Sequence, residues 1–395
     1  MKANEKKISK KFEGFCIFCA ISVLLINIMT MYFVYAGTMD KTIFSIVRYA
    51  LLGFLLFKII AFDVKYYSKK SFLICTGFFL LLLVSSFITD DRLLLQSYIL
   101  ILSMYRVNIK KLLKWSIISI ATVFVIIVAL SLLGVIPDRI FVRVNGIERH
   151  SLGFRWCTAP AIFGWSLTGT YLFLRQKNVK LFEWVILAAV NIIIFLATDT
   201  RLEFIFSIIC IIFSIMYKYG LLAKISKLLN IFAYGLPAIL LAGSVFFAYS
   251  YNPEIPVLKQ INDYSSGRLE LSHEGITEYG VSLIGQSVEW VGQADIYEGT
   301  ADNESFNTID NSYLLVSIKY GVITCAIILV GYMKLNKYAF MSKDYYLLAL
   351  LCLRYVHAFI EPHLFLVTQN LILFLFVIIL TGYHGNVLRG ANNEA

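Results

Sequence analysis

One long stretch of the chain is polar, residues 249–310, and it reads YSYNPEIPVLKQINDYSSGRLELSHEGITEYGVSLIGQSVEWVGQADIYEGTADNESFNTID. It carries eleven carboxylates and only two cations, Lys259 and Arg268, in a chain whose formal net charge is +10. The sequence on either side consists of long apolar runs separated by short basic clusters. Within the stretch, Ser266–Glu270 predicts the start of a short helix, and Asp310–Leu314 marks where the next apolar run begins. We therefore expect one large polar loop between membrane helices.

The composition of the whole chain indicates the same class of protein. Hydrophobic residues make up 59% of the 395 residues and charged residues 15%, and the mean hydropathy is +0.76. These values are typical of an all-α polytopic membrane protein that has the lipid bilayer as its surroundings. The basic residues fall in clusters between apolar runs, so we interpret them as topology signals and expect no nucleic acid partner.

Apolar runs of about 17–25 residues predict about twelve transmembrane helices. Residues 1–248 are expected to hold helices one to nine, 249–310 the extracytoplasmic loop with short helices, 311–383 helices ten to twelve, and 384–395 a cytoplasmic tail. The predicted spans are 14–36, 43–62, 71–88, 92–106, 115–136, 152–174, 181–198, 202–217, 228–248, 311–333, 344–360 and 364–383.

The basic clusters alternate along the chain, as the positive-inside rule requires. If the Lys-rich N-terminus is cytoplasmic, every second connection is basic; examples are Lys65–Lys70 and Arg106–Lys114. The intervening connections are acidic or mixed. The alternation predicts that both termini are cytoplasmic and that residues 249–310 are extracytoplasmic.

Several arginines oppose this rule, because they fall on the predicted outer face. A single one of them is explained as a side chain that snorkels to the headgroups. As a group beside lipid, their fork-shaped donors suit a pyrophosphate or another multiply charged anion. The candidates are Arg143, Arg149, Arg155, Arg201 and Arg268; Arg139 lies among them in sequence.

The polar loop also holds candidates for sugar binding and proton transfer. Glu270, Glu274 and Glu278 are spaced to form one stripe on a helix, with His273 beside it. The stripe is consistent with a solvated face of an interfacial helix, or with a base and groups that orient sugar hydroxyls. Tyr264, Tyr279, Trp290 and Tyr297 offer flat apolar faces of the kind that sugars pack on.

Ionisable residues recur where the loop rejoins the membrane. Asp310-Asn311-Ser312 predicts a helix N-cap and also places a carboxylate at the mouth of the bundle. His357, Glu361 and His363 gather near the predicted outer turn between the last two helices, where ionisable groups suggest function. Asp302, Glu304 and Asp310 match no known metal-binding spacing, so we predict no metal site.

Four segments together resemble the Wzy-type polysaccharide polymerases, which are relatives of the O-antigen ligases. The loop segment SGRLELSHEG (266–275) is similar to the family's Ser-Gly-Arg motif, and Asp310 with Asn311 stands where the family has His-Asn or Asp-Asn before a Tyr-Gly turn. The other two segments are RHSLGF (149–154) and the turn TDTR (198–201). The resemblance covers roughly the second half of the chain.

The resemblance implies a bacterial cytoplasmic membrane protein that polymerises repeat units carried on undecaprenyl pyrophosphate. The reaction would be a metal-independent glycosyl transfer without a cofactor, on the outer leaflet, for a capsule, O-antigen or similar polysaccharide. A chain-length regulator and a flippase are the expected partner proteins. We expect Arg201 and Arg268 to bind the pyrophosphate; the second choices for this role are Arg143, Arg149 and Arg155. We expect Asp310, rather than His273, to act as the base. The expected sugar-binding residues are Glu270, Glu274, Tyr279, Trp290, Asn311 and Tyr313.

Two other functions fit the same sequence. One is an O-antigen-ligase-type transferase, which transfers finished glycan to a different acceptor; Asp310 in place of His favours the polymerase. The other is a flippase or transporter of lipid-linked oligosaccharide, which should carry charges deep within its helices. Arg48, Lys58 and Lys319 are the candidates for such charges. A large acidic loop has no evident purpose in a flippase.

Overall fold

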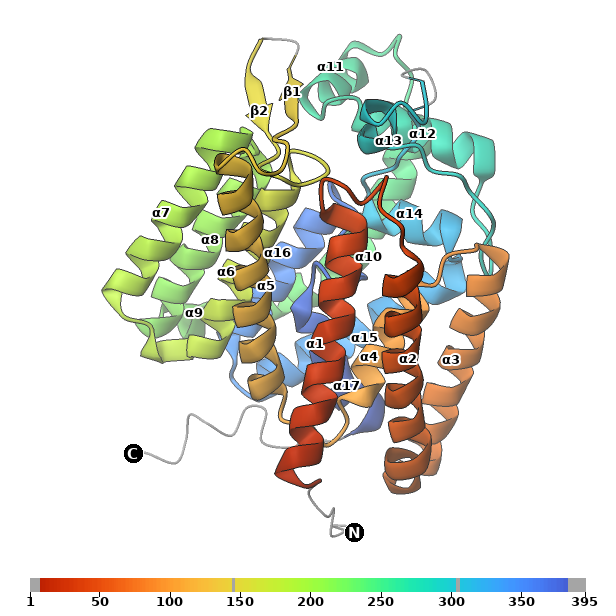
Figure 1. The fold of residues 1–395 in the computed structure, drawn as a ribbon, viewed down its shortest axis with the longest axis vertical. Coiled ribbons are helices and arrows are strands. Elements are labelled where there is room, and N and C mark those ends of the chain that lie inside the picture. The colour runs from red at the N-terminus through yellow and green to blue at the C-terminus, as the bar shows by residue number, and fades with distance from the viewer. Residues whose placement is uncertain (1–7, 144–145, 303–305, 383–395) are drawn as a thin grey trace. The chain divides into compact units, whose positions relative to one another are not determined.

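The structure is a computed structural model that describes residues 8–143, 146–302 and 306–382 (Figure 1). The predicted cytoplasmic tail, 384–395, lies outside the described residues. The described chain forms two compact units. Unit 1 comprises the residues up to Cys75, Gln96–Ala223 and the residues from Val367 onward, and unit 2 comprises Thr76–Leu95 and Lys224–Leu366.

Seven helices within the described ranges are long and apolar enough to cross a membrane, so the chain is a multi-pass membrane protein. Three shorter apolar helices accompany them, and the figure of about twelve spans stays a prediction. The seven are α1 (Lys10–Tyr32), α2 with its continuation (Thr42–Tyr66), α3 (Lys69–Ile88), α5 (Ile109–Leu132), α7 (Leu181–Thr198), α10 (Ser226–Ser250) and α15 (Val322–Met341). The shorter ones are α4 (Leu93–Ser103), α16 (Tyr345–Ala358) and the pair η5–α17 (Leu371–Thr381).

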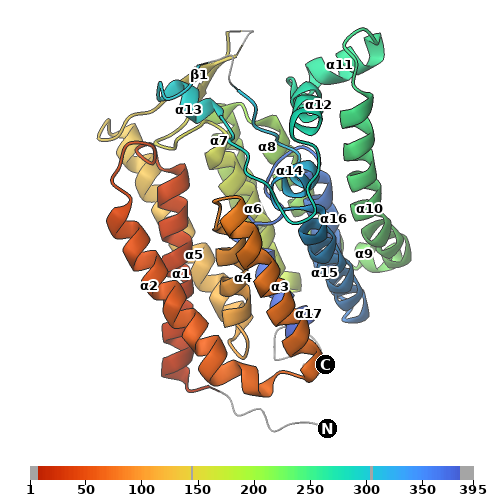
Figure 2. The ribbon, with the colours of Figure 1, turned by 90° about the vertical axis from the view of Figure 1, so that its right-hand side faces the viewer.

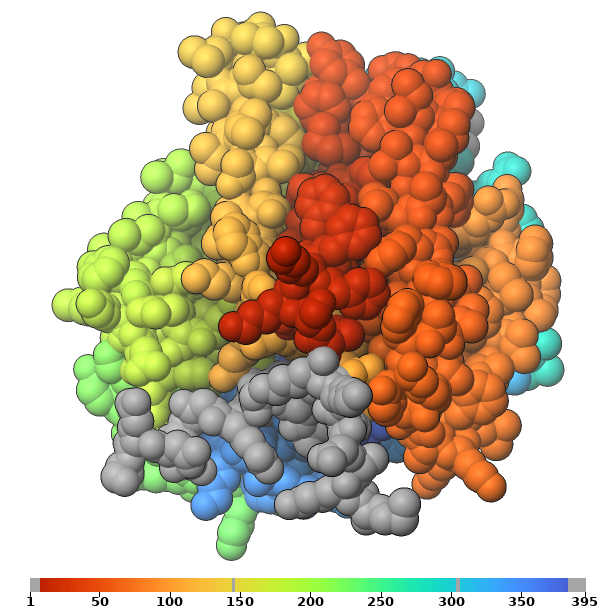
Figure 3. Space-filling view, turned by 60° about the horizontal axis from the view of Figure 1, so that its bottom comes forward, coloured from red at the N-terminus to blue at the C-terminus, as the bar shows by residue number. Residues whose placement is uncertain are grey.

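In unit 1, α1 packs beside α2 and α5, as the red, orange and yellow surfaces of Figure 3 show. Helix α6 (Ala159–Arg175) packs against α5, α7 and α8 (Arg201–Lys218). Helix α2 itself ends at Lys58, and its continuation is one π-helical turn (Ile59–Asp63) followed by a 3-10 turn (Val64–Tyr66). The short elements η3 (Gln176–Asn178) and α9 (Leu221–Lys224) connect longer helices.

A fully buried ion pair closes the end of α2. The Lys58 ammonium lies 2.6 Å from a carboxylate oxygen of Asp63 and donates to the backbone carbonyls of Ser103 and Tyr105, 2.7 Å away in each case. Neither Lys58 nor Asp63 is exposed. Lys58 therefore binds carbonyl groups at the end of α4 and fastens α2 to it.

A two-stranded antiparallel hairpin departs from the all-α prediction. It joins β1 (Ile140–Val142) to β2 (Glu148–His150), with Phe141 opposite Arg149. Buried Arg139 precedes it and donates to the carbonyls of Val34 and Arg155. Residues 140–142 and 148–150 of the arginine-rich connection between α5 and α6 thus pair through their backbones.

The predicted span 152–174 begins as a helix only at Ala159. Leu152 and Gly153 adopt positive φ angles of 51° and 84°, which end any helical continuation toward the hairpin. A β-carbon on Gly153 would lie 2.7 Å from the Cδ1 of Ile136, so the turn needs glycine. The periodic apolar pattern of this segment does not reveal this turn.

Unit 2 is built around α10, which packs against α12, α14, α15 and α16 (Figure 1). The short helices of the polar loop come after α10 in the chain, in the order α11 (Pro256–Tyr264), α12 (Arg268–Tyr279) and α13 (Gln293–Tyr297). Helices α11 and α12 lie at the end of α10 (Figure 2). The predicted helix start at Ser266–Glu270 is confirmed, since Gly267 is the N-cap of α12.

The predicted span 311–333 is broken at Tyr320 and Gly321 into α14 (Ser312–Lys319) and α15. Gly321 has a φ of 95°, and a β-carbon there would lie 2.5 Å from the carbonyl oxygen of Leu283. The polar loop bonds to the backbone groups that the break leaves: Val322 N–H donates to Ser282 O over 2.8 Å, and Gln286 N–H to Lys319 O over 3.0 Å.

The predicted twelfth span, 364–383, is mostly not a regular α-helix. Residues 361–370 form bends and turns, and helical structure begins only with η5 (Leu371–Leu375), which continues as α17 (Phe376–Thr381). Pro362 disfavours helical geometry at Glu361 just after α16 ends. The apolar run therefore overstates the length of the last helix.

Candidate functional site

The foot of the polar loop brings one arginine and two carboxylates together in unit 2. The Nε of Arg268 lies 2.6 Å from Asp310 Oδ2, and one of its terminal nitrogens lies 2.5 Å from Glu361 Oε1. The side chains of Arg268 and Asp310 are 29% and 27% exposed, whereas that of Glu361 is 7% exposed. We call these three residues the Arg268 cluster. Asp310 is its accessible carboxylate and Glu361 its buried one.

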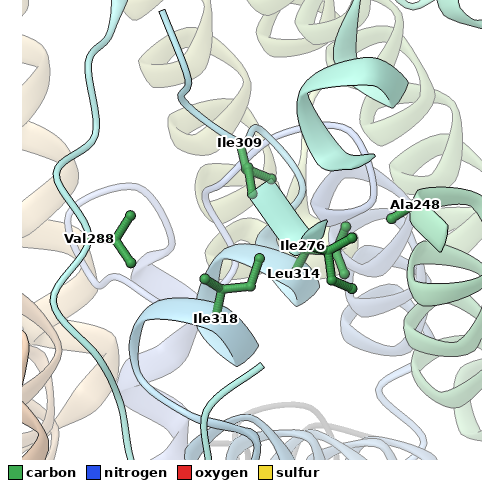
Figure 4. Close-up of a cluster of buried hydrophobic side chains, with 6 residues drawn as sticks. All are labelled: Ala248, Ile276, Val288, Ile309, Leu314 and Ile318. Atoms are coloured by element: carbon green, nitrogen blue, oxygen red, sulfur yellow. The ribbon is translucent and has the colours of Figure 1, made fainter. Parts of the chain in front are cut away.

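Apolar packing fixes the two loop residues of this cluster. Ile276 on α12 and Ile309, next to Asp310, are buried with Leu314 and Ile318 of α14 (Figure 4). A β-carbon on Gly275 would lie 2.3 Å from Ile309 Cδ1, so α12 and the end of the loop touch directly. We call this set the loop cluster; its buried members are Ala248, Ile276, Val288, Ile309, Leu314 and Ile318.

Helix capping positions the third residue. Asn311 is the N-cap of α14, and its side-chain oxygen accepts from the N–H groups of Tyr313 and Leu314, which confirms the predicted cap. Its amide nitrogen donates to the Ser244 hydroxyl and to the Phe359 carbonyl. The Ser312 hydroxyl donates to the backbone carbonyl of Glu361 over 2.6 Å. The start of α14 therefore holds the segment after α16 in place beside Arg268.

Two histidines lie next to the buried carboxylate. His363 Nε2 is 3.5 Å from Glu361 Oε2, and the rings of His357 and His363 are 6.0 Å apart. Both histidines are almost completely buried. Glu361 thus has Arg268 on one oxygen and an imidazole near the other, whereas Asp310 pairs with Arg268.

This asymmetry separates the proton affinities of the two carboxylates. Burial and the charge of Glu361 raise the pKa of Asp310 to about 6, although Arg268 acts in the opposite direction. Burial also favours protonated Glu361, but Arg268 and His363 hold the pKa of Glu361 below its usual range. The cluster therefore favours the ionised form of Glu361, whereas Asp310 takes up a proton at a higher pH than a free aspartate does.

Unit 1 contains a second arginine site, at the turn between α7 and α8. Arg143 Nε lies 2.9 Å from Asp199 Oδ2, and Arg149 donates to the Thr198 carbonyl over 2.8 Å. Arg201 Nε is 3.5 Å from Asp199 Oδ1, and its side chain is 59% exposed. Burial and the charge of Arg149 lower the pKa of Arg143. Arg143 and Arg201 pair with the Asp199 carboxylate, and Arg149 bonds to the neighbouring Thr198 and Thr200. More than one guanidinium group at this turn favours an anion.

The other charged residues predicted for the site differ in their contacts and in their exposure. The Arg155 N–H donates to the Tyr32 carbonyl. His273 is hydrogen-bonded through Nδ1 to the carbonyl of Ala248, so it fastens α12 to α10. Glu274 is exposed on α12, as is Glu270, which also accepts from the Asn262 side chain over 3.2 Å.

The aromatic and capping candidates are less open. Tyr279 and Trp290 pack edge to face, with ring centroids 5.9 Å apart, and both are partly buried against the loop cluster. Tyr313 is completely buried, and its hydroxyl donates to the Tyr355 carbonyl. Asn311 is buried in its capping role. Both side chains therefore have structural partners, and the sugar contacts expected of Asn311 and Tyr313 stay predictions.

The sequence identified all three members of the Arg268 cluster but not their pairing. Arg268 and Asp310 appear there as a pyrophosphate ligand and a base, and Glu361 and His363 as ionisable groups near a turn. Their direct contacts join residues 42 and 93 positions apart, which no local pattern reveals.

Within the described ranges, no group of three or more His, Cys, Asp or Glu residues is arranged to hold a metal ion.

The Arg268 cluster therefore offers a fixed cation, a buried anion and an accessible carboxylate beside the polar loop. Such an arrangement can neutralise a negatively charged leaving group and accept a proton from a hydroxyl. Comparison with protein-family models, curated proteins and solved structures finds no match to this chain, so the functional argument depends on this geometry and on the sequence motifs.

Proposed function

We propose that this protein is a polysaccharide polymerase that joins repeat units carried on undecaprenyl pyrophosphate. The acceptor hydroxyl attacks the anomeric carbon of the donor glycan, and the bond from that carbon to the diphosphate oxygen breaks. The lipid diphosphate leaves with the bonding electrons, and Asp310 takes the proton of the hydroxyl. The reaction is placed at the outer face of a bacterial cytoplasmic membrane, with both termini in the cytoplasm.

The observation that carries the proposal is the contact between Arg268 and the partly exposed Asp310. A diphosphate leaving group needs charge neutralisation more than it needs a proton, and a guanidinium supplies it. The attacking hydroxyl needs a nearby proton acceptor, and Asp310 is poised for this role. Both groups stand where the polar loop rejoins an apolar helix, which suits a substrate that is half lipid and half sugar.

The arginine site of unit 1 supports a polymerase in particular. A polymerase binds two lipid-linked substrates, and each carries its own diphosphate. In unit 1, the turn with Arg143, Arg149 and Arg201 is a second place where binding of a diphosphate is favoured. A ligase that uses a different acceptor has less need of it.

Connections within unit 1 also support the proposed topology. The chain between α1 and α2, the hairpin and the turn between α7 and α8 meet at one end: Arg139 donates to Val34, and Arg143 to Asp199. The chain after α2 meets the end of α4 through Lys58. These groupings match the connections that the alternation of basic clusters assigns to the outer and cytoplasmic sides.

The test uses purified full-length protein in detergent with lipid-linked repeat units as the only substrate. We expect a ladder of lengthened products from the wild type. Arg268→Ala should lower the rate by about 10²- to 10³-fold, because a pre-oriented donor to the leaving group is lost. Asp310→Asn should lower it by about 10²- to 10⁴-fold. Lys259→Ala, at the other cation of the loop, is the matched control and should keep the wild-type ladder.

The alternatives give different results in the same system. Transfer of finished glycan to a second acceptor without a ladder identifies a ligase. Movement of lipid-linked repeat units across liposomes without any transfer identifies a flippase. Among the charged residues considered for a flippase, Lys58 is paired with Asp63, Lys319 with Asp91, and Arg48 donates to Asn27.

A further inference from the structure

The inference concerns the buried carboxylate of the Arg268 cluster, and it rests on the proposed function. Glu361 contacts the same guanidinium as Asp310 but is far less exposed, with 7% of its side chain accessible against 27% for Asp310. A substrate that binds at the loop can therefore meet Asp310 and Arg268, whereas Glu361 lies behind them. Glu361 is also tied down through its backbone, since its carbonyl accepts from the Ser312 hydroxyl.

We propose that Glu361 is a positioning residue that fixes the orientation of Arg268 and keeps a second negative charge beside Asp310. Arg268 is held at Nε by one carboxylate and at a terminal nitrogen by the other, so its plane is set by both contacts. If Asp310 releases the guanidinium during turnover, Glu361 still retains it. The negative charge of Glu361 meanwhile makes Asp310 a better proton acceptor.

The charged groups around Asp310 come from several elements of unit 2. Arg268 on α12 lowers the proton affinity of Asp310, and Glu361 in the segment after α16 raises it. His363, in the same segment, acts in the same direction as Arg268. Arg354 and His357 are on α16, and His357 is close enough to Glu361, His363 and Arg354 to be affected by their charges.

Helices α10 and α14 contribute neutral groups at this point. Ser244 of α10 bonds to Asn311, and α14 begins with Ser312. His273 of α12 bonds to Ala248 of α10. The charge of Glu361 is thus the main one that favours the protonated form of Asp310.

Substitution of Glu361 then changes the pH dependence in a defined direction. In Glu361→Gln, Asp310 keeps Arg268 as a partner but loses a neighbouring anion, and this loss lowers the pKa of Asp310. The pH below which the polymerisation rate falls should move down by about one unit or more. The maximal rate should also fall by about 10-fold or more, because Arg268 loses the contact with Glu361 that helps to orient its guanidinium group. Glu361→Asp keeps a carboxylate, so the pH below which its rate falls should lie between the values for wild type and Glu361→Gln.

The experiment measures the rate of ladder formation between pH 4.5 and 8 for wild type, Glu361→Gln, Glu361→Asp and a control. The control is Glu254→Gln, which changes an exposed carboxylate of the polar loop. A downward shift in Glu361→Gln alone, with partial recovery in Glu361→Asp, supports the proposal. If Glu361→Gln is slower but its rate falls at the same pH as in wild type, the proposal is overturned, because a purely structural role of Glu361 predicts that result.

A second measurement separates this inference from the proposed function. Infrared difference spectroscopy of protein with ¹³C-labelled aspartate, compared with Asp310→Asn, reports the protonation midpoint of Asp310 without turnover. A lower midpoint in Glu361→Gln supports the positioning role even if no ladder forms, in which case only the proposed function fails. An unchanged midpoint in folded Glu361→Gln protein overturns the inference whatever the ladder shows.

Discussion

Removal of the Arg268 guanidinium should destabilise the protein chiefly through the carboxylate that it leaves behind. In Arg268→Ala, Glu361 stays buried without its main partner, and loss of one member of a buried ion pair costs about 3–5 kcal/mol. We take the lower end, about 3 kcal/mol, because Arg268 is 29% exposed and His363 Nε2 lies 3.5 Å from Glu361. The contact with the more exposed Asp310 adds less than about 1 kcal/mol.

The double variant tests this reasoning. Glu361→Gln alone keeps the Arg268–Asp310 contact and should cost about 1 kcal/mol. Combined with Arg268→Ala, it removes the buried charge, so the pair should cost about 1–2 kcal/mol rather than the sum of about 4 kcal/mol. The double variant should therefore be more stable, by at least about 2 kcal/mol, than the sum of the two single effects predicts.

Equilibrium unfolding in detergent mixtures measures these free energies, with tryptophan fluorescence as the signal. The control pair is Lys259→Ala and Glu254→Gln, two exposed loop positions whose effects should be small and additive within about 0.5 kcal/mol. If the Arg268 and Glu361 substitutions also add, with the double variant losing about 4 kcal/mol, the argument that a stranded buried charge dominates is refuted.

Three further predictions follow from contacts described above. Gly321→Ala should destabilise the protein by about 2 kcal/mol or more, because its β-carbon meets the Leu283 carbonyl and φ is positive; an unfolding midpoint equal to wild type would contradict this. Lys58→Met should cost about 3–5 kcal/mol, with much of the loss recovered when Asp63→Asn is added; thermal unfolding in detergent measures both, and a double variant no better than the single one argues against the pair. The rate of polymerisation should fall as the pH drops through about 6, because Asp310 must be deprotonated to accept a proton; a rate profile flat from pH 5 to 7 rules out Asp310 as the base.

Local sequence chemistry predicted several features of the fold correctly. The end of the polar loop is clear from Asp310 and Asn311, because an N-cap depends on a few consecutive residues. The helix start at Arg268 follows likewise from Ser266-Gly267, both of which take positive φ angles. Long apolar runs identify membrane helices because the bilayer fixes their length.

Features that depend on distant contacts were not predictable in this way. The resemblance includes a Tyr-Gly turn at Tyr320-Gly321, but the apolar pattern continues through it, and the bonds from residues 282–286 of the loop to the backbone there lie far away in the chain. The hairpin between β1 and β2 forms in a stretch that shows only a turn signal. The pairing of Arg268 with Glu361 links two segments far apart in the chain. The hydropathy of the sequence predicts which segments lie in lipid, but it does not predict which distant polar side chains contact one another.

The loop cluster bears on how this protein can be recombined with others. Ile276, Val288 and Ile309 are carried by the polar segment, but they pack on Ala248 at the end of α10 and on Leu314 and Ile318 of α14. A chimera that transplants residues 249–310 alone would cut through this contact and leave Asp310, next to Ile309, poorly seated. A graft that spans 248–318 carries the complete apolar patch with it, so its exchange boundaries are those that should yield a well-folded hybrid.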